Sequence, residues 1–201
     1  KYKFCTKKNE YYSENHLENL SNFFNTNINI SKFKISNSHE KYLKEAKRLL
    51  PDKNYIGFSL TQGNVYRKKS WSLDKFIEVA KEVVKRNDIP VFFIQKEHVE
   101  IINSIKNQVK ESIFPEEASS LSGPALVTAL STRLKQAITI DNGIMHMISL
   151  SKIPMIVLFG PTKSSKFAPK IKDIKILDSK EIYNSSDINK ISAQEVIEFL
   201  N

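Results

Sequence analysis

The stretch Ala137-Ile-Thr-Ile-Asp-Asn-Gly-Ile-Met-His146, followed by Pro154-Met-Ile-Val-Leu-Phe-Gly-Pro-Thr162, decides the fold of this chain. Each stretch opens with apolar residues that do not alternate with polar ones, which is typical of a strand buried on both faces. A helix is expected to begin near Gly143, because polar residues and a glycine end the first apolar run. Two buried strands joined by a single helix predict a parallel βαβ unit.

The same alternation of strands and helices continues on both sides of this unit. It predicts an α/β domain over residues 54–201, with a doubly wound, Rossmann-like parallel sheet covered by helices on both faces. The expected strands are 55–60, 90–94, 137–140, 154–159 and 174–177, with helices beginning near Ser72, Glu97, Ala125, Gly143 and the capping box at Ser192.

Residues 1–53 have a different composition. Helices are expected at 15–24 and 40–50, joined by an Asn-rich link, and the stretch is too small and too polar to form a domain alone. The first residue is Lys1 rather than Met. We therefore expect residues 1–53 to be an interdomain connector and the remnant of an N-terminal domain that the chain lacks.

The composition excludes several classes of protein. With 201 residues, 40% hydrophobic and 26% charged, the chain is neither disordered nor fibrous as a whole. A single cysteine, Cys5, excludes a disulfide framework and fits a reducing compartment. The sequence has no signal peptide and no apolar run long enough to cross a bilayer, so we expect a cytoplasmic location.

The net charge of +9 is unevenly distributed. Residues 1–70 carry 14 basic and 6 acidic side chains, whereas residues 71–201 carry 17 and 16. A basic first third is compatible with a binding module for nucleic acid or an anionic membrane surface, and equally with an ordinary solvated surface.

Polar residues cluster where the predicted strands end. In open parallel sheets, ligands bind at the carboxyl ends of the strands. These loops hold the candidate site residues Gly63, Lys69, Glu97, Asp141, Asn142, Gly143, His146 and Thr162.

Two of these loops suggest anion binding. The step Asp141-Asn142-Gly143 precedes a helix, whose first N–H groups lack intrahelical partners and favour negative charge. The alternative is that Asp141 or Asn142 is only a helix cap. Lys69 ends the basic run 67–69 and lies next to Trp71, which should pack and fix the loop, although a solvated basic loop is the alternative.

The usual fingerprints of other nucleotide-binding and hydrolytic domains are absent from the sequence. It contains no Gly-x-Gly-x-x-Gly, no Gly-x-x-x-x-Gly-Lys-Ser/Thr and no Gly-x-Ser-x-Gly. The domain is therefore neither a typical dinucleotide fold nor a P-loop module.

Taken in order, the loops resemble the C-terminal half of glycosyltransferase family 9, the ADP-heptose:lipopolysaccharide heptosyltransferases, which have the two-domain GT-B architecture. Phe159-Gly-Pro-Thr162 matches that family's pattern fully, and Asp141-Asn-Gly-Ile-Met-His146 matches with Asn where the family has Ser or Thr. Lys69-Ser-Trp-Ser72 stands in place of Lys-Arg-Trp-Pro, Glu97 follows the second strand, and Gln62-Gly-Asn-Val65 keeps the glycine of the first loop.

The resemblance implies that this half binds the nucleotide-sugar donor, with ADP-heptose as the default. Lys69 would contact the diphosphate or the sugar, and Asn142 with Gly143 would hold the phosphates. Asp141 would contact the transferred sugar, with His146 nearby.

On the same resemblance, Glu97 would bind the ribose and the adenine would lie against 121–123, which includes Ser122. Gly63 and Thr162 would line the crevice. The reaction would be inverting and independent of metal, with no cofactor besides the donor. The acceptor would be a glycolipid, no nucleic acid is expected, and the protein would contact the anionic inner membrane peripherally.

The general base of that family is a carboxylate of the N-terminal half, so no residue of this chain is assigned to that role. We expect the chain alone to be inactive. Two alternatives stay open: another GT-B transferase that uses a UDP sugar, and the basic binding module described above.

Overall fold

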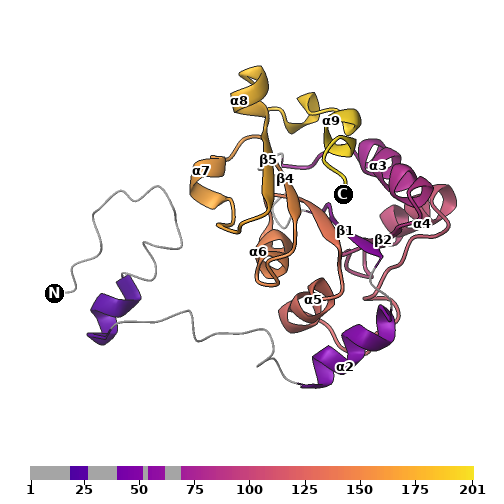
Figure 1. Ribbon diagram of the computed structural model, residues 1–201, viewed down its shortest axis with the longest axis horizontal. Helices are drawn as coiled ribbons and strands as arrows, with labels where there is room; N and C mark the ends of the chain where they lie inside the picture. The colour runs from indigo at the N-terminus through magenta and orange to yellow at the C-terminus, as the bar shows by residue number, and fades with distance from the viewer. Residues whose placement is uncertain (1–18, 27–39, 52–53, 62–68) are drawn as a thin grey trace.

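A computed structural model describes residues 19–26, 40–51, 54–61 and 69–201 of the chain. Its described strands form one sheet in which every neighbouring pair is parallel, in the spatial order β2-β1-β3-β4-β5 (Figure 1). The predicted α/β fold is therefore confirmed. The strands are β1 (Tyr55–Ser59), β2 (Ile89–Phe92), β3 (Gln136–Ile140), β4 (Met155–Phe159) and β5 (Ile174–Asp178).

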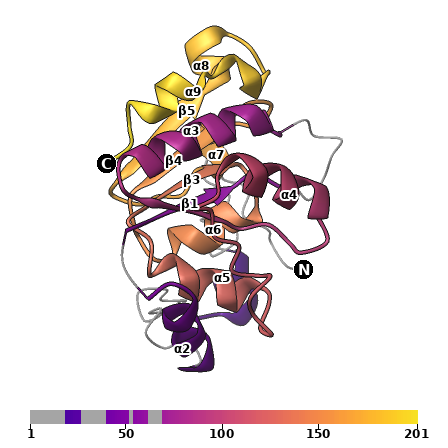
Figure 2. The same ribbon diagram turned by 90° about the vertical axis from the view of Figure 1, so that its right-hand side faces the viewer.

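Helices cover both faces of the sheet, so the domain is doubly wound (Figure 2). The first face packs against α3 (Leu73–Lys85), α4 (Val99–Gln108) and α9 (Ala193–Ile197). The opposite face packs against α2 (Glu40–Leu49), α5 (Pro124–Ser131) and α6 (Gly143–Ser149). Shorter helices follow β4 and β5, namely α7 (Ser164–Phe167), α8 (Ser179–Tyr183) and the 3-10 helix η4 (Ile188–Lys190).

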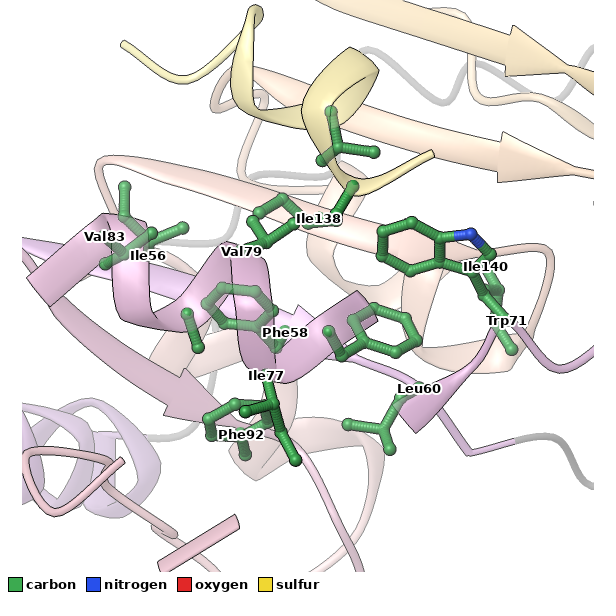
Figure 3. Close-up of a cluster of buried hydrophobic side chains, with 14 of the residues drawn as sticks. Ile56, Phe58, Leu60, Trp71, Ile77, Val79, Val83, Phe92, Ile138 and Ile140 are labelled. Carbon is green, nitrogen blue, oxygen red and sulfur yellow. The ribbon is translucent and has the colours of Figure 1, made fainter. Parts of the chain in front are cut away.

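Alternate residues of each strand enter these two layers of core. On β1, Ile56 and Phe58 face α3, where Phe58 stacks on Phe92 with ring centroids 4.8 Å apart (Figure 3). Gly57 faces the other layer, where an added Cβ would come within 2.6 Å of Leu134 Cδ1. A side chain at this position would therefore clash with the core.

The order of the strands creates a crevice at the carboxyl edge of the sheet. β1 lies between β2 and β3: the chain leaves it through α3 for β2 on one side, and later enters β3 on the other side. The connections that follow β1 and β3 thus diverge to opposite faces, through α3 and α6. Such a reversal of strand order is where doubly wound sheets bind ligands.

The packed unit extends upstream of the boundary that we predicted at residue 54. Helix α2, which matches the expected helix 40–50, packs against α5, and Ala46 and Leu50 are buried in the core. The guanidinium of Arg133 donates to the carbonyl of Leu50 at 2.9 Å, which fixes the end of this segment. Of the expected helix 15–24, residues 19–24 are helical and the remainder lies outside the described residues.

Candidate functional site

A pocket of about 580 Å³ opens at the crevice between β1 and β3. Its volume lies in the range of sites that bind small molecules, roughly 300–1,000 Å³. One wall is polar and comes from residues 95–97 after β2. A second part of the lining mixes polar and apolar side chains of the segment 116–124 and α5, and the start of α6 completes the lining.

Four of the predicted site residues line this pocket: Glu97, Ser122, Asn142 and Gly143. Gly63 lies outside the described residues, so its predicted role stays a prediction. The apolar part of the lining includes Leu121, Val127, Ile144 and Met147, which offer a surface for a flat aromatic ring.

Three other predicted residues meet beside the pocket at a single carboxylate. The ammonium of Lys69 pairs with Asp141 Oδ2, and Thr162 Oγ1 donates to the same oxygen at 2.7 Å. The side chains of Lys69 and Asp141 are only 12% and 7% exposed. Loops after β1, β3 and β4 thus converge on a buried ion pair, which we call the Lys69–Asp141–Thr162 cluster.

The position of Lys69 is set by its neighbour Trp71, as the sequence suggested. The Trp71 indole is buried, stands edge-on to the Phe76 ring at 4.8 Å, and donates from Nε1 to the carbonyl of Ile191 at 2.9 Å. It joins the layer of core that faces α3 (Figure 3). Only Ser70 separates Lys69 from this anchored indole, which leaves the ammonium little freedom to move away from Asp141.

Asn142 is fully engaged by the protein. Its Oδ1 accepts from the backbone N–H of Met145 at 2.9 Å and caps α6. Its Nδ2 donates to Ser59 Oγ at 2.7 Å and to the carbonyl of Thr61 at 3.0 Å. Since an amide has only two N–H donors, the Asn142 side chain ties β1 to α6 and is left without a donor for a ligand.

His146 lies on the exposed side of α6, and it does not belong to the pocket lining. Partial desolvation by the surrounding protein lowers the pKa of its imidazole, although the residue as a whole is exposed. The negative charge of Asp141 raises the pKa of the His146 imidazole, and the positive charge of Lys69 lowers it. His146 therefore favours the neutral form next to the Lys69–Asp141–Thr162 cluster.

One acidic residue of the pocket was missed by the sequence reasoning. Glu116 lines the pocket, is partly buried, and has a raised pKa, first because of burial and second because of the charge of Glu97. The sequence holds no signal that separates Glu116 from its neighbour Glu117, which points away and pairs with Lys106 at 2.6 Å.

The sequence of the chain matches a known family. The sequence model of "Glycosyltransferase family 9 (heptosyltransferase)" matches residues 7–197. The lipooligosaccharide heptosyltransferase 2 of a Campylobacter jejuni strain is 25% identical over 162 residues, which is 79% of this chain and 48% of that protein. The chain spans less than half the length of the curated relatives it matches.

Solved structures with the same fold belong to similar proteins. A family 9 glycosyl transferase from Veillonella parvula has a TM-score of 0.76 at 19% identity, covering 98% of this chain and 60% of its own. The Escherichia coli heptosyltransferase WaaC, solved with ADP-2-deoxy-2-fluoro heptose, has a TM-score of 0.69 at 13% identity, covering 99% and 57%. At these identities the likeness establishes the fold, the Rossmann-like half of a GT-B architecture.

Proposed function

The chain belongs to glycosyltransferase family 9, the heptosyltransferase family, and on this premise we propose that it binds the nucleotide-sugar donor of a glycosyl transfer. The observation that carries the proposal is the contact between two parts of one site. Asn142 and Gly143 line the pocket, and Asp141, which directly precedes them in the chain, forms the buried pair with Lys69.

In the proposed complex the nucleoside occupies the pocket, with its ribose hydroxyls donating to Glu97. The adenine lies against the apolar wall near Leu121 and Ser122. The diphosphate lies at Gly143, where the space for a side chain is open: beyond its chain neighbours and its own helix backbone, the nearest atom to an added Cβ is Met147 Cε at 4.0 Å. ADP-heptose is the proposed donor, because the family is that of heptosyltransferases and a structural neighbour was solved with an ADP-heptose analogue.

The proposed reaction inverts the configuration at the anomeric carbon of the donor sugar. The acceptor hydroxyl oxygen attacks that carbon, the bond from the carbon to the β-phosphate oxygen breaks, and ADP leaves with the electron pair. The ammonium of Lys69 would stabilise the charge that develops on the leaving diphosphate, while Asp141 and Thr162 hold that ammonium in place. We propose that this step needs no metal.

The acceptor proton must go to a general base, which we place in a part of the protein outside this chain. The acceptor itself is proposed to be a glycolipid of the lipopolysaccharide type, since the curated relative is named a lipooligosaccharide heptosyltransferase. We also propose a cytoplasmic location with peripheral contact to anionic lipid through the basic residues 1–70. Among the described residues, no helix has the length and apolarity to cross a bilayer.

Calorimetric titration of the chain with ADP tests the proposal. Lys69→Ala should weaken ADP binding about tenfold or more, because it removes a charge-assisted contact to phosphate. Lys81→Ala is the matched control, since Lys81 is exposed on α3 and does not belong to the pocket lining. Equal affinity of wild type and Lys69→Ala would contradict the proposal.

The same titration separates the remaining alternatives. Stronger binding of UDP than of ADP would favour a transferase that uses a UDP sugar. Binding of duplex DNA or RNA at physiological salt, with a steep salt dependence, would favour the nucleic-acid module instead.

A further inference from the structure

We propose that Glu116 recognises the exocyclic amino group of the adenine and thereby selects the base of the donor nucleotide. This inference rests on the proposed function, because it requires that the pocket takes a nucleoside diphosphate. It concerns a residue to which neither the family pattern nor the sequence reasoning gave a role.

The first argument is the environment of the Glu116 carboxylate. It lines the pocket and is partly buried, yet among the described residues no cation or hydrogen-bond donor is paired with it. Burial raises the pKa of this carboxyl, and the charge of Glu97 raises it further. A ligand that brings a hydrogen-bond donor to Glu116 would therefore stabilise a charge that the free protein leaves without compensation.

The second argument is that Glu116 is held on a rigid wall. It lies in a turn in which the N–H of Glu117 donates to the carbonyl of Phe114 at 3.1 Å. The Phe114 ring is buried and stacks on Phe92 with centroids 5.5 Å apart. A turn anchored in the core in this way presents its side chain in a fixed place before the ligand arrives.

Helix α2 fixes the other end of the same wall. Arg48 Nη2 donates to the carbonyl of Ala118 at 2.8 Å, and Ser119 Oγ donates to Glu45 Oε1 at 2.6 Å. The segment that follows contains Leu121 and Ser122, against which the adenine is proposed to lie. Glu116 thus lies on the same segment as the residues proposed to contact the base, whereas Glu97 lies on the segment that follows β2.

The chemistry of adenosine supplies the third argument. In a 5′-diphosphate of adenosine, the hydrogen-bond donors are the two ribose hydroxyls and one amino group on the base. Glu97, on the segment that follows β2, takes the hydroxyls in the proposed complex. The amino group is then the one donor left for a second carboxylate.

The test compares ADP with purine riboside 5′-diphosphate, which carries hydrogen in place of the amino group. Wild type should bind ADP about tenfold more tightly, as expected for one hydrogen bond to a charged acceptor. In Glu116→Ala the two ligands should bind equally well, and Glu116→Gln, which keeps a neutral acceptor, should show an intermediate preference. Glu117→Ala is the matched control and should keep the wild-type preference, because Glu117 pairs with Lys106 outside the pocket lining.

An unchanged preference for ADP in both Glu116 variants would overturn the inference. It would also be overturned if Glu116→Ala changed the preference for ADP over 2′-deoxy-ADP and not the preference for the amino group, because Glu116 would then contact the ribose. Failure of the proposed function looks different: ADP would not bind wild type, or Lys69→Ala would bind it unchanged. If the proposed function holds, Lys69→Ala should weaken both purine ligands by the same factor.

Discussion

Two neighbouring regions of the carboxyl edge differ in how they treat their charges. In the Lys69–Asp141–Thr162 cluster, a buried carboxylate is paired with an ammonium and accepts from a hydroxyl. In the pocket, the charge of Glu97 raises the pKa of the Glu116 carboxyl. Among the described residues, no cation is paired with either carboxylate. The cluster is therefore complete in the free protein, whereas the pocket gains its hydrogen-bond donors from a ligand.

This difference predicts that removing the carboxylate of the cluster destabilises the fold, and that removing a carboxylate of the pocket acts mainly on binding. Breaking a buried pair leaves one charge without compensation, which is costly. Removing an exposed carboxylate from a pocket costs the fold little.

Asp141→Ala should have the largest effect. It removes the carboxylate that pairs with the buried Lys69 ammonium and accepts from Thr162, so the free energy of unfolding should fall by about 3 kcal/mol. Urea denaturation of both proteins measures this. Asp141→Asn keeps an acceptor and should lose less, and the exposed Asp173→Ala should lose almost nothing. A loss at Asp141→Ala no larger than at Asp173→Ala would contradict the described pair.

Asn142→Ala should come next, with a loss of about 2 kcal/mol. It removes the cap of α6 and the two hydrogen bonds to Ser59 and Thr61. Asn142→Ser keeps a capping oxygen but is too short to reach Ser59 and Thr61. It therefore separates the contribution of the helix cap from that of the hydrogen bonds to Ser59 and Thr61. If Asn142→Ser matched wild type in both unfolding and ADP affinity, the link between β1 and α6 would have no role.

Glu45→Gln should destabilise the chain by about 1 kcal/mol near neutral pH. Hydrogen bonds from Arg48 and then from Ser119 lower the pKa of the Glu45 carboxyl from 4.5 to about 2. The folded chain thus binds fewer protons there than the unfolded chain, so this contribution is complete above about pH 4.5 and declines as the pH falls toward 2. Unfolding measured from pH 6 to pH 3 should therefore show the gap between wild type and Glu45→Gln closing. A gap independent of pH would contradict this assignment.

Glu97→Gln should have the smallest effect on the fold. Because Glu97 is exposed, the free energy of unfolding should change by less than about 0.5 kcal/mol. The affinity for ADP should nevertheless fall several-fold, since a charged acceptor of the ribose hydroxyls becomes neutral. Glu100→Gln, exposed on α4 and absent from the pocket lining, is the matched control for both measurements. A large loss of stability in Glu97→Gln would remove the contrast between the two regions.

The fold and the placement of the strand-end loops could be predicted because both depend on local signals. Apolar runs separated by single helices indicate a doubly wound sheet, and its carboxyl edge brings Lys69, Asp141 and Thr162 together whatever the details of packing. The predicted helix start near Glu97 was two residues early, since α4 begins at Val99. Boundaries of this kind depend on the exact turn geometry.

Contacts between distant segments could not be predicted. Ser59, the partner of Asn142, lies 83 residues upstream, and nothing in either local pattern indicates that they meet. Likewise, Glu116 and Glu117 are neighbours of the same type, and only the turn at Phe114 decides which of them faces the pocket. The membership of α2 in the packed unit depends in the same way on its contacts with α5.

Gly160 follows β4 in the motif that ends at Thr162, where a glycine would ordinarily be attributed to the close approach of a ligand. Here an added Cβ would lie 2.8 Å from Ile188 Cβ and 3.0 Å from the carbonyl oxygen of Ser186. The glycine is thus required by the chain's own C-terminal segment, which crosses directly over the strand end. A protein shortened before residue 186 would uncover the loop that carries Thr162, so the segment that contains Ser186 and Ile188 is part of the scaffold of the site.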